Sequence, residues 1–152
     1  MDLCYNNKII AEKGVLIMSL TKIKVRYAET DAMAIVHHAN YYVYFEVARE
    51  DLIRESGISY RDLEESGIMM PLVETHCRYM DAAKYDDDLI VEASVGEITP
   101  IKVKIEYVVR LEKDNKILAK GSTLQTFVDS KTFKIINLKK ENKDVWSKLT
   151  GV

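Results

Sequence analysis

An acidic residue and two adjacent histidines mark one short stretch of the chain as a candidate for chemistry. Asp31 stands in a loop, and His37 and His38 come just before an aromatic segment that begins at Asn40. Asn is a good N-cap residue, so we expect a helix to start there. The unpaired N–H groups of a helix N-terminus bind an anion, or a carbonyl oxygen that is becoming one. A carboxylate on the other side of such a carbonyl attacks it or activates water.

The same residues could instead have a structural role or bind a metal. Asp31 by itself would also suit a turn-capping role, which is common for Asp in loops. The histidine pair raises the question of a metal site, which needs three or four ligands held together. The remaining histidine, His76, has Cys77 beside it, and these neighbours would point to opposite faces of a strand. We therefore expect no metal.

Length, charge and cysteine content favour a single domain without a nucleic-acid or membrane partner. The chain has 152 residues, which is typical of one domain, and a net charge of -2, which gives no support to a nucleic-acid partner. Cys4 and Cys77 do not make a disulfide framework, and this favours a cytoplasmic setting. No apolar run approaches the roughly 20 residues that span a bilayer, so we expect no membrane partner.

The elements that must position Asp31 follow from hydrophobic periodicity. We treat residues 1–17 as an N-terminal extension of uncertain structure and residues 18–152 as a single domain. Alternation predicts a half-buried strand over residues 22–27. Apolar residues spaced by three and four predict a long helix over residues 41–56 with one broad apolar face.

The rest of the chain reads as strands joined by tight turns. A short helix over residues 60–66 has capping-box spacing at Ser59 and Asp62. Alternation then predicts strands over residues 73–79, 89–95, 101–111 and 117–128, with Gly121 marking a bend or a close backbone approach. A short strand over residues 133–138 and a helix over residues 139–149 complete the prediction. Hairpin connections imply antiparallel pairing, so we expect an α+β fold in which the sheet wraps around one long central helix.

Particular motifs resemble a known family. The run DAMAIVHHANY at residues 31–41, with Phe45-Glu46 and Ala48-Arg49 behind it, resembles the 4-hydroxybenzoyl-CoA thioesterase family of hotdog-fold acyl-CoA thioesterases. Residues 77–89 resemble the second and third strands of that family. The resemblance extends over about residues 20–128 and implies a hotdog domain at residues 18–152.

The resemblance also implies roles for individual residues. Asp31 would be the catalytic carboxylate, and the backbone N–H of His38 would polarise the thioester carbonyl. The substrate-binding residues would be His37, Tyr41, Glu46 and Lys102. Tyr41 belongs to an aromatic stripe whose pattern favours a core over a substrate pocket, and Glu46 is either a solvated ion-pairing residue or an interfacial carboxylate near the partner's Asp31. The family implies homodimers or homotetramers with acyl-CoA as substrate and no separate cofactor.

The sequence departs from the family pattern at two positions. The family usually has glycine where Ala34 stands, and a positive φ there would cost alanine about 1 kcal/mol. The basic cluster that grips CoA phosphates in one branch would fall near residues 99–101, where only Lys102 and Lys104 are close in sequence. Two alternatives to a thioesterase stay open: an acyl thioester dehydratase on the same fold, and a non-catalytic acyl-CoA-binding module.

Overall fold

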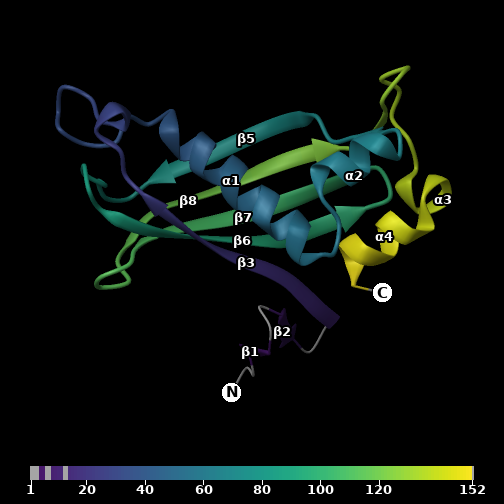
Figure 1. Cartoon of the computed structure of the whole chain (residues 1–152), viewed down its shortest axis with the longest axis horizontal. Helices are drawn as coiled ribbons and strands as arrows, with labels where there is room; N and C mark the ends of the chain where they lie inside the picture. The colour runs from purple at the N-terminus through teal and green to yellow at the C-terminus, as the bar shows by residue number, and fades with distance from the viewer. Residues whose placement is uncertain (1–3, 6–7, 12–13, 152) are drawn as a thin grey trace.

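The computed structural model describes residues 4–5, 8–11 and 14–151 and has two layers, a sheet and a long helix (Figure 1). All strand pairs in the sheet are antiparallel, in the order β1-β2-β3-β6-β7-β8-β5. These strands are β1 (Cys4–Tyr5), β2 (Lys8–Ala11), β3 (Gly14–Lys24), β5 (Leu72–Tyr79), β6 (Asp88–Thr99), β7 (Lys102–Leu111) and β8 (Ile117–Thr126). The helix α1 (Asn40–Glu55) lies across one face of the sheet, as in a hotdog fold, so the predicted α+β architecture is confirmed.

Smaller elements surround this core. A second sheet pairs β4 (Ile68–Met69) with β9 (Val128–Asp129). The short helices are η1 (Tyr27–Glu29), a 3-10 turn, with α2 (Tyr60–Glu65), α3 (Leu138–Glu141) and α4 (Lys143–Thr150). The expected capping box between Ser59 and Asp62 is present at the start of α2.

Strand β3 extends across the domain boundary that we expected at residue 18. β3 begins at Gly14, and its pairing with β6 begins where Met18 faces Ser94. Of the expected extension, residues 1–3, 6–7 and 12–13 lie outside the described residues. The division of the chain at residue 18 stays a prediction.

The aromatic face of α1 packs into the concave side of the sheet. Phe45 is fully buried, and its ring stacks on Tyr107 with ring centroids 4.4 Å apart. A Cβ atom on Gly121 would lie 2.5 Å from the Phe45 ring. The expected close approach at this glycine is therefore confirmed, and its cause is the helix that crosses β8.

Two expectations near the start of the domain are corrected. The strand predicted over residues 22–27 ends at Lys24, because hydrogen bonds between Arg26 and Glu29 turn the chain into η1. The N-cap of α1 is Ala39 and not Asn40. The Asn40 side chain instead donates a hydrogen bond to the carbonyl of Glu29 at 2.8 Å, so it serves the preceding loop.

The C-terminal segment also differs from the prediction. In place of a strand over residues 133–138, Ile135 makes an isolated bridge to Val128. The helix predicted over residues 139–149 is divided into α3 and α4. Asn142 separates them, because its side chain accepts the N–H of Val145 and so caps the start of α4.

Candidate active site

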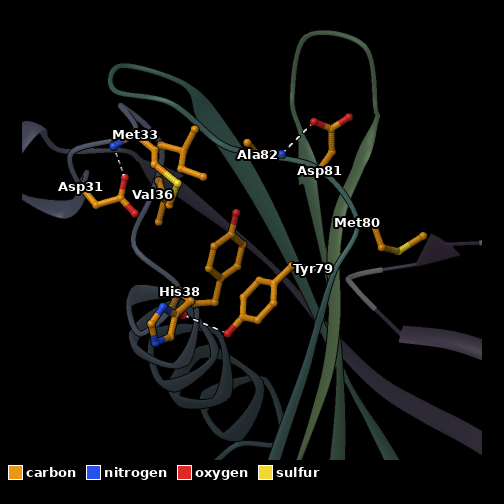
Figure 2. Close-up of a pocket in the computed structure, with 10 residues that line it drawn as sticks. Asp31, Met33, Val36, His38, Tyr79, Met80, Asp81 and Ala82 are labelled. Carbon is orange, nitrogen blue, oxygen red and sulfur yellow. Dashed lines mark hydrogen bonds between the residues drawn. The ribbon is translucent and has the colours of Figure 1, made fainter.

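A cavity of about 330 Å³ opens where the Asp31 loop, the start of α1 and the end of β5 meet (Figure 2). Asp31 and His38, which the sequence analysis singled out as catalytic, both line it. Segments distant in sequence complete the wall, and the full lining is Asp31, Met33, Ile35, Val36, His38, Tyr41, Tyr79, Met80, Asp81 and Ala82. The fold therefore brings the predicted carboxylate and the predicted helix start into one site.

The loop around Asp31 leaves part of its carboxylate available. Asp31 is half-buried, and one carboxylate oxygen, Oδ1, accepts the backbone N–H of Met33 at 2.8 Å. Its backbone N–H donates to the carbonyl of Ile35, and its own carbonyl accepts the N–H of Ala34. Within the described part of the chain, Oδ2 has no hydrogen-bond donor and the carboxylate has no ion-pair partner. The side chain is thus oriented by the loop while one oxygen stays free to react.

The positive φ angle that the departure from the family's glycine raised at Ala34 is present in this loop. Ala34 has a φ of 59°, in the left-handed region that glycine adopts without steric cost. An L-residue with a Cβ atom pays about 1–2 kcal/mol there. Alanine at this position therefore leaves the loop intact but strained.

The residues just before α1 supply a free backbone donor. The N–H of His37 donates to the carbonyl of Glu29 at 2.9 Å, and the N–H of Ala39 donates to Nδ1 of His37 at 3.3 Å. Between them, the N–H of His38 has no acceptor among the described residues. An unpaired donor at the positive end of a helix is suited to hold a developing oxyanion.

Two tyrosines form the wall opposite Asp31. The hydroxyl of Tyr79 donates to the carbonyl of His38 at 3.1 Å, and the ring of Tyr79 meets that of Tyr41 edge-on. Burial raises the pKa of Tyr41 above its ordinary value of 10.0. Burial and a hydrogen bond with Cys77 likewise raise the pKa of Tyr79. Both hydroxyls are therefore protonated at neutral pH, and that of Tyr79 donates to His38.

The other predicted substrate-binding residues lie outside the cavity lining. The His37 ring packs against that of His38 with centroids 4.1 Å apart, on the exposed surface beside the cavity. Glu46 is exposed on α1, and Lys102 lies at the start of β7 in a separate hollow with Glu74 and Glu97. Nothing in this geometry tests their roles, which stay predictions.

Sequence reasoning did not find several cavity residues. The sequence pattern places Tyr79 only at the end of a predicted strand, and Met80, Asp81 and Ala82 only within the stretch at residues 77–89 that resembles the family's strands. The sequence pattern assigns no role to Glu29, which the structure shows to be buried and hydrogen-bonded. A carboxylate two positions before the loop acid was the one available signal, and it did not distinguish Glu29 from a surface residue.

Two further features of the described residues concern possible metal ligands and membrane-spanning helices. Among them, no group of three or more His, Cys, Asp or Glu side chains is placed to hold a metal ion. Within the same described residues, every helix is too short or too polar to cross a membrane.

Comparison with known proteins shows the family. Residues 25–145 match the thioesterase-like superfamily. The Bacillus subtilis protein YneP is 33% identical over 123 residues, which cover 81% of this chain and 88% of YneP. The acyl-CoA thioesterase YbgC of Haemophilus influenzae is 33% identical over 122 residues, which cover 80% of this chain and 88% of YbgC.

Solved structures agree with the sequence relatives. The DHNA-CoA thioesterase of Staphylococcus aureus superposes with a TM-score of 0.82 at 34% identity, over 88% of this chain and 91% of that one. The chain therefore belongs to the thioesterase-like superfamily of hotdog proteins, and the resemblance to the 4-hydroxybenzoyl-CoA thioesterase family is confirmed. It is a thioester hydrolase of that superfamily.

Proposed function

We propose that the protein is an acyl-CoA thioesterase, which hydrolyses an acyl-CoA thioester to the free acid and CoA. Asp31 acts as the base or the nucleophile, and the backbone N–H of His38 holds the oxyanion. The observation that carries this proposal is that a carboxylate with one free oxygen and an unpaired helix N–H line the same cavity. The named activities of the Haemophilus and Staphylococcus relatives support acyl-CoA as the substrate.

Two reaction routes fit these groups. In the first, an Asp31 oxygen attacks the thioester carbon, the C–S bond breaks, and CoA leaves as a thiolate that takes up a proton. Water then hydrolyses the mixed anhydride and regenerates the carboxylate. In the second, Asp31 removes a proton from a water molecule as the water attacks the same carbon, after which the C–S bond breaks and Asp31 passes the proton to the leaving CoA thiolate. In both routes the negative charge develops on the carbonyl oxygen, where the His38 N–H stabilises it.

We infer that the working form is a homodimer, or a homotetramer built from two such dimers. β5 is an edge strand of the sheet, and Leu72 and Val73 on it are 52% and 60% exposed. An exposed apolar edge is a template for pairing with another strand. Tyr79 and Met80 lie at the end of this edge and line the cavity, so a second copy paired along β5 would wall the site. In that assembly His37, Glu46 and Lys102 are proposed to contact the substrate.

The two alternatives make different demands on the site. A dehydratase pairs a histidine with an acid on the helix. The acids of the cavity lining are Asp31 and Asp81, neither of which lies on α1. A non-catalytic module predicts saturable acyl-CoA binding without release of thiol. No separate cofactor is expected, since CoA is part of the substrate, and the cytoplasmic setting stays a prediction.

The test is Asp31→Asn, which keeps the size and the loop hydrogen bond of the side chain but removes its charge. We expect release of thiol from acyl-CoA to fall by about 10²–10⁴-fold, with circular dichroism and oligomeric state unchanged. Asp86→Asn is the matched control, because Asp86 is an exposed acid outside the cavity lining. Hydrolysis by the Asp31 variant at the parent rate would show that the site is assigned wrongly.

A further inference from the structure

A buried acid lies just before the reactive loop. Glu29 is only 5% exposed, and its carboxylate accepts four hydrogen bonds. Three come from Arg26: the backbone N–H at 2.8 Å, Nε at 3.0 Å and an Nη atom at 2.9 Å. The fourth comes from the hydroxyl of Tyr44, on the second turn of α1, at 3.0 Å. The side chain of Glu29 therefore connects Arg26, just after β3, to Tyr44 on α1.

The backbone of the same residue holds the other end of the loop. The carbonyl of Glu29 accepts the N–H of His37 at 2.9 Å and the side-chain amide of Asn40 at 2.8 Å. His37 immediately precedes His38, and Glu29 stands two residues before Asp31. Glu29 therefore lies in the chain segment that leads to Asp31, and its carbonyl is hydrogen-bonded to the segment that carries the free N–H of His38.

We propose that Glu29 is a positioning residue that sets the placement of Asp31 relative to the N–H of His38. This inference rests on the proposed thioesterase function of those two groups. Hydrogen bonds within the loop shape it around Asp31, and the bonds of Glu29 fix the loop relative to the segment that carries His38. Misplacement of a reacting group by about 1 Å can cost about 10²-fold in rate.

The chemistry of the Glu29 site requires a charged acceptor. All four groups that face its carboxylate are donors, and a carboxylate accepts on both oxygens. Glutamine at this position would turn an NH₂ group toward those donors and leave part of the set without an acceptor. Glu29→Gln therefore keeps the volume of the side chain while it loosens the connection.

A positioning role and a purely structural role predict different kinetics. Glu29 does not line the cavity, so its replacement removes no group that contacts the substrate. If Glu29 positions the reacting groups, kcat falls while KM stays nearly constant. If Glu29 only stabilises the fold, the protein that remains folded keeps its parent kcat.

The experiment compares variants with matched loss of stability. Glu29→Gln and Tyr44→Phe are assayed for release of thiol from acyl-CoA, well below the lowest Tm of the set. The control is Val103→Ala, which deletes buried methyl groups at the opposite end of the sheet from Tyr79. We expect kcat of Glu29→Gln to fall by about 10–100-fold with KM within about threefold, a smaller fall for Tyr44→Phe, and parent kcat for Val103→Ala.

Each outcome decides the inference. A Glu29→Gln variant with the kcat of Val103→Ala overturns it. If Glu29→Gln does not fold, Tyr44→Phe removes a single donor and decides alone, and a parent kcat there overturns the inference. Asp31→Asn is assayed in parallel: an active Asp31 variant refutes the proposed function itself, whereas an inactive one beside a fully active Glu29 variant refutes only the positioning role.

Discussion

The hydroxyl group of Tyr79 donates a hydrogen bond to the backbone carbonyl of His38 at 3.1 Å. This bond connects the end of β5 to the residue just before the N-cap of α1, directly beside the cavity, as Figure 2 shows. The N–H of His38 is the donor proposed for the oxyanion. The strand thereby orients the peptide unit that follows His38, next to the peptide unit whose N–H the proposed chemistry uses.

Removal of this hydrogen bond should weaken catalysis modestly. A net hydrogen bond contributes about 0.5–1.5 kcal/mol, so Tyr79→Phe should lower kcat/KM by about 2–10-fold. Thiol release measures the change, and thermal unfolding measures any accompanying loss of stability. Tyr85→Phe is the matched control, because Tyr85 is an exposed tyrosine outside the cavity lining. Equal activity of the two variants would contradict a role for the bond.

Close packing of α1 on β8 should make Gly121 intolerant of a side chain. A Cβ atom there would lie 2.5 Å from the Phe45 ring and 2.6 Å from the carbonyl oxygen of His76. Gly121→Ala should therefore lower the free energy of unfolding by about 1–3 kcal/mol, measured by urea titration. The control is Gly96→Ala, whose Cβ would meet the flexible Glu106 side chain at 3.0 Å. A neutral Gly121→Ala would mean that the helix does not approach so closely.

The strained loop residue offers a stabilising substitution. Ala34 has a φ of 59°, and glycine would relieve about 1–2 kcal/mol of steric cost. The greater freedom of glycine in the unfolded chain offsets about 0.4–1 kcal/mol of this gain. We expect Ala34→Gly to raise Tm slightly.

The opposite substitution, glycine to alanine at a positive φ angle, tests the same steric cost. Gly57 has a φ of 88°, and a Cβ atom there would contact nothing within 4 Å. Gly57→Ala should therefore lose about 1–2 kcal/mol through backbone strain alone. A lower Tm for Ala34→Gly would show that the loop does not hold this conformation.

Glu29 should make stability depend on pH in the acid range. Burial tends to raise the pKa of Glu29, but hydrogen bonds from Arg26 and Tyr44 lower it below the ordinary value of 4.5. Because the folded pKa is the lower one, the stabilising contribution is present above about pH 4.5 and is lost as the pH falls through the folded pKa.

The pH effect is measured as a difference between two proteins. The Tm of the parent minus that of Glu29→Gln should be largest near neutral pH and should shrink below pH 4.5. Subtraction cancels other carboxylates with lowered pKa values, such as Asp62 and Asp129, which both proteins share. A difference that is constant with pH would contradict the charged hydrogen-bonded state of Glu29.

Local patterns in the sequence determined most of the elements and part of the site. The spacing of apolar residues located α1 within a residue of its ends, and alternation located β5 to β8. Gly121 indicated a close backbone approach, and the helix start drew attention to Asp31 and His38, whose predicted roles came from the family resemblance. Such features depend on interactions between near neighbours in the chain, which the sequence displays directly.

Tertiary structure alone decided which distant groups meet around Asp31. Tyr79 bonds to a residue 41 positions earlier, and this pairing depends on the order and register of the strands between them. Burial of Glu29 and the use of Asn40 to hold the loop instead of capping α1 were decided in the same way. Hydrogen bonds of this kind arise only when packing brings a donor and an acceptor together, so no periodicity along the chain records them.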